Sequence, residues 1–189
     1  VISSIFLLRP FTVKADVNVN INKETQIVTD LIGQYSINYT GDANFFGFYG
    51  YYENNNYNEM VKDTDFKATV DTIGKDKIVN SSIASLKKTD GATQIEAAYL
   101  VWETSVQGKN KTDLVKKAAN KAIYFAGATA KGAFTKKVNA SYAAVDMREP
   151  HLGTKEYTFS CMYTDVTATV QKYGYGKYGV ANIPYVEST

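Results

Sequence analysis

Residues 83–103 read IASLKKTDGATQIEAAYLVWE, and this stretch decides the expected fold. Among its first five residues, Ile83, Ser85 and Lys87 alternate with Ala84 and Leu86, and such alternation is typical of a β-strand with one solvated face. Asp90-Gly91 suits a tight hairpin turn, because both central residues of such a turn accept positive φ. The return strand, 94–103, is mostly apolar toward its end, which indicates a central strand buried on both faces. The stretch therefore predicts an antiparallel hairpin with Trp102 in the core.

Strand patterns recur along most of the chain. Alternating or apolar runs predict further strands at 17–22, 34–40, 122–126, 141–145, 157–163 and 178–183. With 15 Tyr and 9 Phe, the chain is also rich in the aromatic residues that favour strands. We expect a mainly β protein whose architecture is an antiparallel, jelly-roll-like β-sandwich.

One short helix is expected near residues 165–173. Apolar residues recur there at i, i+4 and i+7, on one helix face, and a glycine follows them: Val166, Val170, Tyr173 and Gly174. Asp165 or Thr164 can satisfy the free N–H groups of the first turn. The segment 112–119 predicts no more than a short capped helical turn.

The composition excludes several classes of protein. The chain has 21 Lys and Arg against 19 Asp and Glu, and this net charge of +2 is far from the basic excess of nucleic-acid-binding proteins. One Cys and one His exclude a disulfide scaffold and zinc sites built from several thiolates or histidines. Past the first fifteen residues, no segment has the roughly 18 consecutive apolar residues that cross a bilayer. We therefore expect neither nucleic-acid binding nor membrane insertion of the mature part.

The first fifteen residues, VISSIFLLRPFTVKA, are similar to the end of a secretory signal peptide. An apolar run leads to Val13-Lys14-Ala15, and such a sequence suits the shallow pockets of the signal peptidase. The alternative interpretation is a first β-strand. We expect residues 1–15 to be a partial signal peptide, residues 16–189 to form a single β-sandwich domain, and the protein to be secreted or held at the cell surface.

The sequence offers little catalytic chemistry. The only histidine, His151, lies in an expected loop, and no Gly-x-Ser-x-Gly motif accompanies it. Four aspartates lie close together, at Asp63, Asp65, Asp71 and Asp76. They permit a calcium ion, but their spacing differs from that of the twelve-residue calcium loop, and a solvated acidic loop is the simpler interpretation. We predict no catalytic residues, no cofactor and no metal ligands.

The best candidate binding surface is the segment NFFGFYGYYENNNY at residues 44–57. Tyr and Asn together provide flat apolar area and adaptable hydrogen bonds, the mixture that recognises sugars or protein loops. Alternating aromatic residues also fill ordinary sheets, so a structural role is the alternative. If the segment holds a site, the expected ligand-binding residues are Tyr51, Tyr52, Asn54, Asn55, Asn56 and Tyr57.

Four short motifs follow one another in the chain: NSSIASL at 80–86, IEAAYLVW at 95–102, YTDVT at 163–167 and GKYGVANI at 176–183. Together they resemble the amino-terminal β-sandwich module of large exported bacterial surface proteins, which are adhesin-like and carry repeated immunoglobulin-like stalk domains. The resemblance covers residues 33–189, with Val101 where tyrosine is usual. It implies a further apolar strand after Ile183, and hence a domain truncated at its C-terminus. The family has no established catalytic residues to carry over.

These observations lead to two expected functions. The first is a non-catalytic module of an exported cell-surface protein, with an adhesion or scaffold role at the tip of a stalk and a host or cell-surface protein or glycan as its partner. The alternative is a carbohydrate-binding or carbohydrate-active β-sandwich of a secreted enzyme. Selective binding on a glycan array would favour the alternative.

Overall fold

The structure is a computed structural model that describes residues 19–21, 58–88, 90–107, 112–148 and 157–184. Its strands are β1 (Val19–Ile21), β2 (Ser81–Leu86), β3 (Tyr99–Gln107), β4 (Ile123–Thr129), β5 (Gly132–Val138), β6 (Tyr142–Arg148), β7 (Tyr157–Asp165) and β8 (Gly176–Ala181). Its helices are α1 (Glu59–Lys62), α2 (Lys67–Ile73), α3 (Thr112–Ala119) and α4 (Thr167–Tyr173), with the 3-10 helices η1 (Thr64–Phe66) and η2 (Lys75–Lys77). The strand predicted at 34–40 lies outside the described residues.

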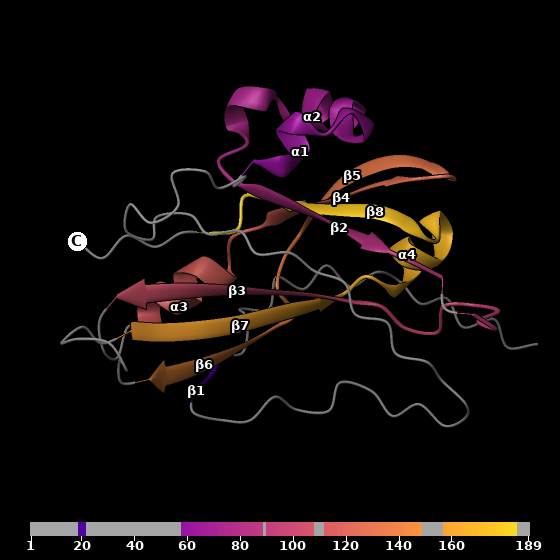
Figure 1. The fold of residues 1–189 in the computed structure, drawn as a ribbon. Coiled ribbons are helices and arrows are strands. Elements are labelled where there is room, and N and C mark those ends of the chain that lie inside the picture. The colour runs from indigo at the N-terminus through magenta and orange to yellow at the C-terminus, as the bar shows by residue number, and fades with distance from the viewer. Residues whose placement is uncertain (1–18, 22–57, 89, 108–111, 149–156, 185–189) are drawn as a thin grey trace, which may run out of the picture.

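The strands form two four-stranded sheets (Figure 1). Sheet A has the order β1-β6-β7-β3, and sheet B has the order β2-β8-β4-β5. Neighbouring strands are antiparallel, except that the short β1 runs parallel to β6. The predicted mainly β, antiparallel sandwich is thereby confirmed.

Sheet B is covered on both of its faces. Along β4, Ile123 and Phe125 pack with side chains of sheet A and α4, whereas Tyr124 and Ala126 pack with the segment from α1 to α2. This alternation arises because successive side chains of a strand point to opposite faces. Figure 1 shows α1 and α2 on the side of sheet B that faces away from sheet A. The described residues thus form three layers, with sheet B in the middle.

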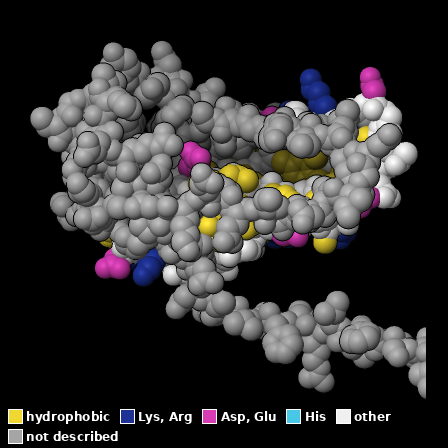
Figure 2. Space-filling view, turned by 90° about the horizontal axis from the view of Figure 1, so that it is seen from below, with side chains coloured by type: hydrophobic (Ala, Val, Ile, Leu, Met, Phe, Trp, Pro, Cys, Tyr) yellow, Lys and Arg dark blue, Asp and Glu magenta, His cyan; other side chains and the backbone are white. Residues whose placement is uncertain are grey.

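The core between the two sheets is built around Trp102. Its side chain is 4% exposed and belongs to a cluster with Ile123 of sheet B and Met162 of β7, so its predicted burial is confirmed. The buried indole N–H finds no hydrogen-bond partner among the described residues. Figure 2, viewed from the side on which sheet A lies, shows several hydrophobic side chains of the described residues near one another.

The prediction that the two strands within residues 83–103 pair as a hairpin is wrong. β2 pairs with β8 in sheet B, and β3 pairs with β7 in sheet A. The turn at Asp90-Gly91 forms, with Gly91 at φ 78°, but the chain there passes from one sheet to the other. β3 is also not buried on both faces. Trp102 faces the core, whereas Val101 is 56% exposed, and among the described strands β3 lies at an edge of sheet A.

Helix α4 confirms the helix predicted near residues 165–173. The backbone N–H of Thr167 donates to Asp165 Oδ1 at 2.7 Å, as expected of a residue that satisfies the first turn. Val170 is buried in a cluster with residues of sheet B. Gly174 ends the helix at φ 72°, a left-handed conformation that favours glycine.

Two other helical regions exceed the predictions. α3 is an eight-residue helix rather than a single capped turn. The segment 59–77, interpreted from its sequence as an acidic loop, folds into α1, η1, α2 and η2. Phe66, Val70 and Ile73 recur there at i, i+4 and i+7 and are buried in one cluster with Ala126 of β4. Burial of this apolar stripe against sheet B favours a helical segment, even though acidic residues lie between the apolar ones.

Candidate functional site

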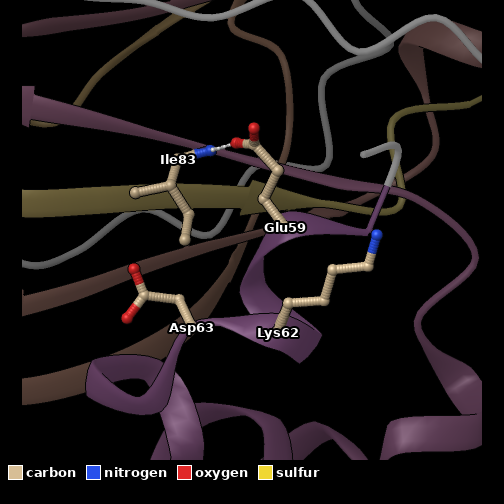
Figure 3. A pocket seen from close by; sticks show the side chains of 4 residues that line it. All are labelled: Glu59, Lys62, Asp63 and Ile83. Atoms are coloured by element: carbon tan, nitrogen blue, oxygen red, sulfur yellow. Dashed lines mark hydrogen bonds between the residues drawn. The ribbon is translucent and has the colours of Figure 1, made fainter. Parts of the chain in front are cut away.

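An open hollow of about 380 Å³ lies between α1 and β2 (Figure 3). It is lined by Glu59, Lys62, Asp63 and Ile83. Three of these four side chains are charged, so the hollow is a polar concave feature to consider as a site. Figure 3 shows Glu59 reaching toward Ile83 while Lys62 extends away from Asp63.

Glu59 is held by the edge of β2. The backbone N–H of Ile83 donates to Glu59 Oε2 at 2.7 Å, and the backbone N–H of Met60 donates to Ser81 Oγ at 3.1 Å. Met60 is fully buried, so these contacts fix α1 against the strand. An edge strand leaves every second N–H without a partner in the ladder, and the Glu59 carboxylate supplies one for Ile83. Glu59 therefore serves the packing of α1.

Asp63 is held by Lys177 of β8. Lys177 Nζ lies 2.8 Å from Asp63 Oδ2 and 2.8 Å from Asp65 Oδ2. The hydrogen bond from Lys177 lowers the pKa of Asp63, although burial of the carboxyl acts in the opposite direction. The same two carboxylates raise the pKa of Lys177 above its ordinary value. The ammonium therefore stays protonated at neutral pH, and a protonated amine is not a nucleophile.

The four aspartates at 63–76 do not form the predicted acidic loop. Two of them share Lys177, Asp71 pairs with Lys67 at 2.9 Å within α2, and Asp76 lies in η2. Within the described ranges, no three His, Cys, Asp or Glu side chains form a group that could hold a metal ion. The acidic residues here belong to ion pairs and helix termini.

Two asparagines of the motifs at the start of β2 and the end of β8 join these two strands. Asn80 Nδ2 donates to the carbonyl of Ile183 at 2.9 Å, and Asn80 Oδ1 accepts the N–H of Ile183 at 2.9 Å. Asn182 Oδ1 accepts the N–H of Val79 at 2.9 Å, and Asn182 Nδ2 donates to the carbonyl of Lys77 at 2.9 Å. The backbone N–H of Asn182 also donates to the carbonyl of Asn80 at 2.9 Å. We call Asn80 and Asn182 the asparagine clamp.

Sequence reasoning missed the asparagine clamp. Both residues stand in the motifs quoted above, but the contact joins positions 103 residues apart in the chain, as from Asn80 to Ile183. A signal was present, because Asn80 precedes the strand predicted from residue 83 and Asn182 lies near the end of the strand predicted at 178–183, and short amides at strand ends often bond to the backbone.

The predicted ligand-binding residues lie outside the described part of the chain: Tyr51, Tyr52, Asn54, Asn55, Asn56 and Tyr57. His151 and the predicted signal segment 1–15 lie outside it as well. Over the ranges that are described, no helix combines the length and apolar character required to span a bilayer. No protein-family model, curated protein or solved structure matches the chain.

Proposed function

We propose that the chain is a non-catalytic module of an exported cell-surface protein, with a role in adhesion or as a scaffold. The asparagine clamp is the observation that carries the proposal. Asn80 and Asn182 belong to the motifs that resemble surface-protein modules, and both direct their side-chain polar atoms to the backbone of a neighbouring segment. These motif residues therefore build the framework and leave recognition to other surfaces.

Trp102 is a further motif residue with the same kind of role, because it packs between the sheets. If such buried motif residues serve the framework, the surfaces that bind partners are free to differ from one module to another. This separation suits a domain that presents surfaces on a rigid scaffold.

The charged hollow supports the same proposal. The Glu59 carboxylate accepts the N–H of Ile83, and the Asp63 carboxylate accepts from Lys177. General acid–base catalysis favours a group whose pKa lies near the working pH, whereas the lowered pKa of Asp63 lies further from neutral pH than that of an ordinary aspartate. These carboxylates stabilise the packing of α1 and η1 on sheet B.

Locating the protein on the cell that makes it tests the proposal. Antibodies against the full chain should label intact cells, and protease added outside should remove the label while a cytosolic marker survives. Beads coated with the full chain should attach to cells or matrix more than beads coated with an unrelated β-sandwich. A protease-resistant intracellular pool, or turnover of a substrate by the purified chain, would contradict the proposal.

A further inference from the structure

The face of sheet A that points away from the core carries a cluster of tyrosines. Trp102, Met162 and Ala143 point into the core, so their neighbours along β3, β7 and β6 point outward. In the register of the sheet, Val101 lies opposite Tyr163, and Tyr163 lies opposite Tyr142. We define the tyrosine face by these outward residues of the three strands: Tyr99, Val101, Glu103, Tyr142 and Tyr163.

The three tyrosine rings of this face contact one another, two of them stacked and the third perpendicular to the ring between them. The rings of Tyr142 and Tyr163 stack, with centroids 5.1 Å apart and planes at 28°. The ring of Tyr99 is perpendicular to that of Tyr163, at 89°, with a centroid distance of 6.3 Å. Tyr142 is only 9% exposed, whereas Tyr99 and Tyr163 are half-buried and Val101 beside them is 56% exposed, so the part of this face along β3 and β7 is the part open to solvent. Aromatic rings carry negative charge on their faces, and this attracts cations.

The charged side chains that the structure describes on this face have one sign. Glu103 is exposed on β3, and the exposed Asp165 stands opposite Tyr99 in the register. The described side chains on this face of β3, β6 and β7 include these two carboxylates and no Lys or Arg. Burial, and then the charge of Glu103, raises the pKa of Cys161, which lies opposite Glu103 on β7. A partner that complements the face is therefore positively charged.

We propose that the tyrosine face binds a cationic segment of a partner protein, with an arginine or lysine side chain against the tyrosine rings. The inference rests on the proposed adhesion function and names the chemistry of the partner. The rings supply cation–π attraction, and Glu103 and Asp165 supply Coulomb attraction at the border of the apolar patch. Anionic partners, including nucleic acids and acidic lipid headgroups, meet charge of their own sign here.

Two peptides test the proposal with the full chain. One alternates Gly with Arg, the other alternates Gly with Glu, and binding of each is followed by calorimetry and by amide NMR shifts. The Arg peptide should bind and should shift the amides of β3, β6 and β7, and its affinity should fall as salt is added. The Glu peptide should not bind. Equal binding of the two peptides would overturn the proposal.

Matched variants locate the binding surface. Tyr163→Leu removes the ring shared by both aromatic contacts and should weaken binding of the Arg peptide about 5- to 10-fold. Glu103→Lys, at an exposed position, should weaken it at least as much without affecting the fold. The controls are Asp90→Lys and Val79→Ser, which change an exposed acid and an exposed valine outside this face and should leave the affinity unchanged.

The outcomes separate this inference from the proposed function. If Tyr163→Leu fails to fold, the affinity of Glu103→Lys decides the matter, because that side chain is exposed. The proposal of a cationic partner would be overturned if Glu103→Lys bound the Arg peptide as tightly as the parent chain. It would also be overturned if the chain selectively bound a neutral glycan and Tyr163→Leu abolished that binding. If the Arg peptide fails to bind while intact cells are still labelled and coated beads still attach, this inference falls and the proposed function stands.

Discussion

Replacing Asn182 tests whether the asparagine clamp stabilises the fold as its contacts indicate. Asn182 has φ 61°, a left-handed conformation that asparagine and glycine accept far more readily than alanine. Its side chain also makes two hydrogen bonds of 2.9 Å to the backbone of Val79 and Lys77. Asn182→Gly therefore retains the backbone conformation and loses both bonds, whereas Asn182→Ala loses both bonds and adds backbone strain.

The expected losses follow from these two terms. A hydrogen bond contributes about 0.5–1.5 kcal/mol net, so Asn182→Gly should cost about 1–3 kcal/mol of the free energy of unfolding. A left-handed alanine should add about 1 kcal/mol in Asn182→Ala. For a domain of this size each kcal/mol lowers Tm by about 2–4 °C. The glycine variant should thus melt clearly below the parent chain, and the alanine variant lower still.

Thermal and urea unfolding of the full chain, followed by circular dichroism, measures both variants. Asn139→Ala is the matched control, because Asn139 is exposed, and it should change the free energy of unfolding by less than about 0.5 kcal/mol. The reasoning is refuted if Asn182→Gly is as stable as the parent chain. It is also refuted if the alanine variant is as stable as the glycine variant, because the left-handed backbone would then carry no cost.

Three further substitutions test the packing of the fold. Trp102→Ala should cost about 3–5 kcal/mol, and the native indole should emit at short wavelength, whereas emission typical of water-exposed indole would contradict its burial. Gly179→Ala places a Cβ 2.8 Å from Met60 Sδ, so the free energy of unfolding should fall by about 1–3 kcal/mol in urea unfolding. An unchanged urea midpoint would show that α1 does not pack tightly against β8. Lys177→Gln removes the cation that lowers the pKa of Asp63. Because this pKa is lowered in the folded chain, the ionised Asp63 stabilises the fold above its unfolded pKa near 3.8, and this stabilisation is lost as pH falls through the lower folded pKa. The stability difference between the parent chain and Lys177→Gln should therefore narrow below about pH 4, and a difference that persists there would rule out the ion pair as its cause.

The elements that could be predicted from sequence are those that local pattern determines. The strands predicted at 157–163 and 178–183 correspond to β7 and β8, and the helix near 165–173 corresponds to α4. Trp102 is buried as predicted, because the burial of an indole depends little on which strand is its neighbour. In each case the deciding information lies within a few residues of the chain.

Strand partners could not be predicted, because they depend on contacts between distant residues. Asp90-Gly91 specifies a turn, but residues 92–98 separate that turn from β3, and burial of Trp102 beside Met162 places β3 in sheet A. The helices at 59–77 were missed for a related reason. Four aspartates suggested a solvated loop, while the stripe of Phe66, Val70 and Ile73 specifies a helical segment only once sheet B is present to cover it.

The two sheets differ in which surfaces the fold leaves open. Both faces of sheet B are covered within the described residues, by α1 and α2 on one side and by sheet A and α4 on the other. On sheet A, Trp102 faces the core and its neighbour Val101 is 56% exposed, so one residue contributes to the core and the next to the surface. A change at 102 alters the free energy of unfolding, whereas a change at 101 alters the surface beside Tyr163 and leaves the core intact. Val101 therefore lies at a position where the exposed surface can change while the framework that displays it stays the same.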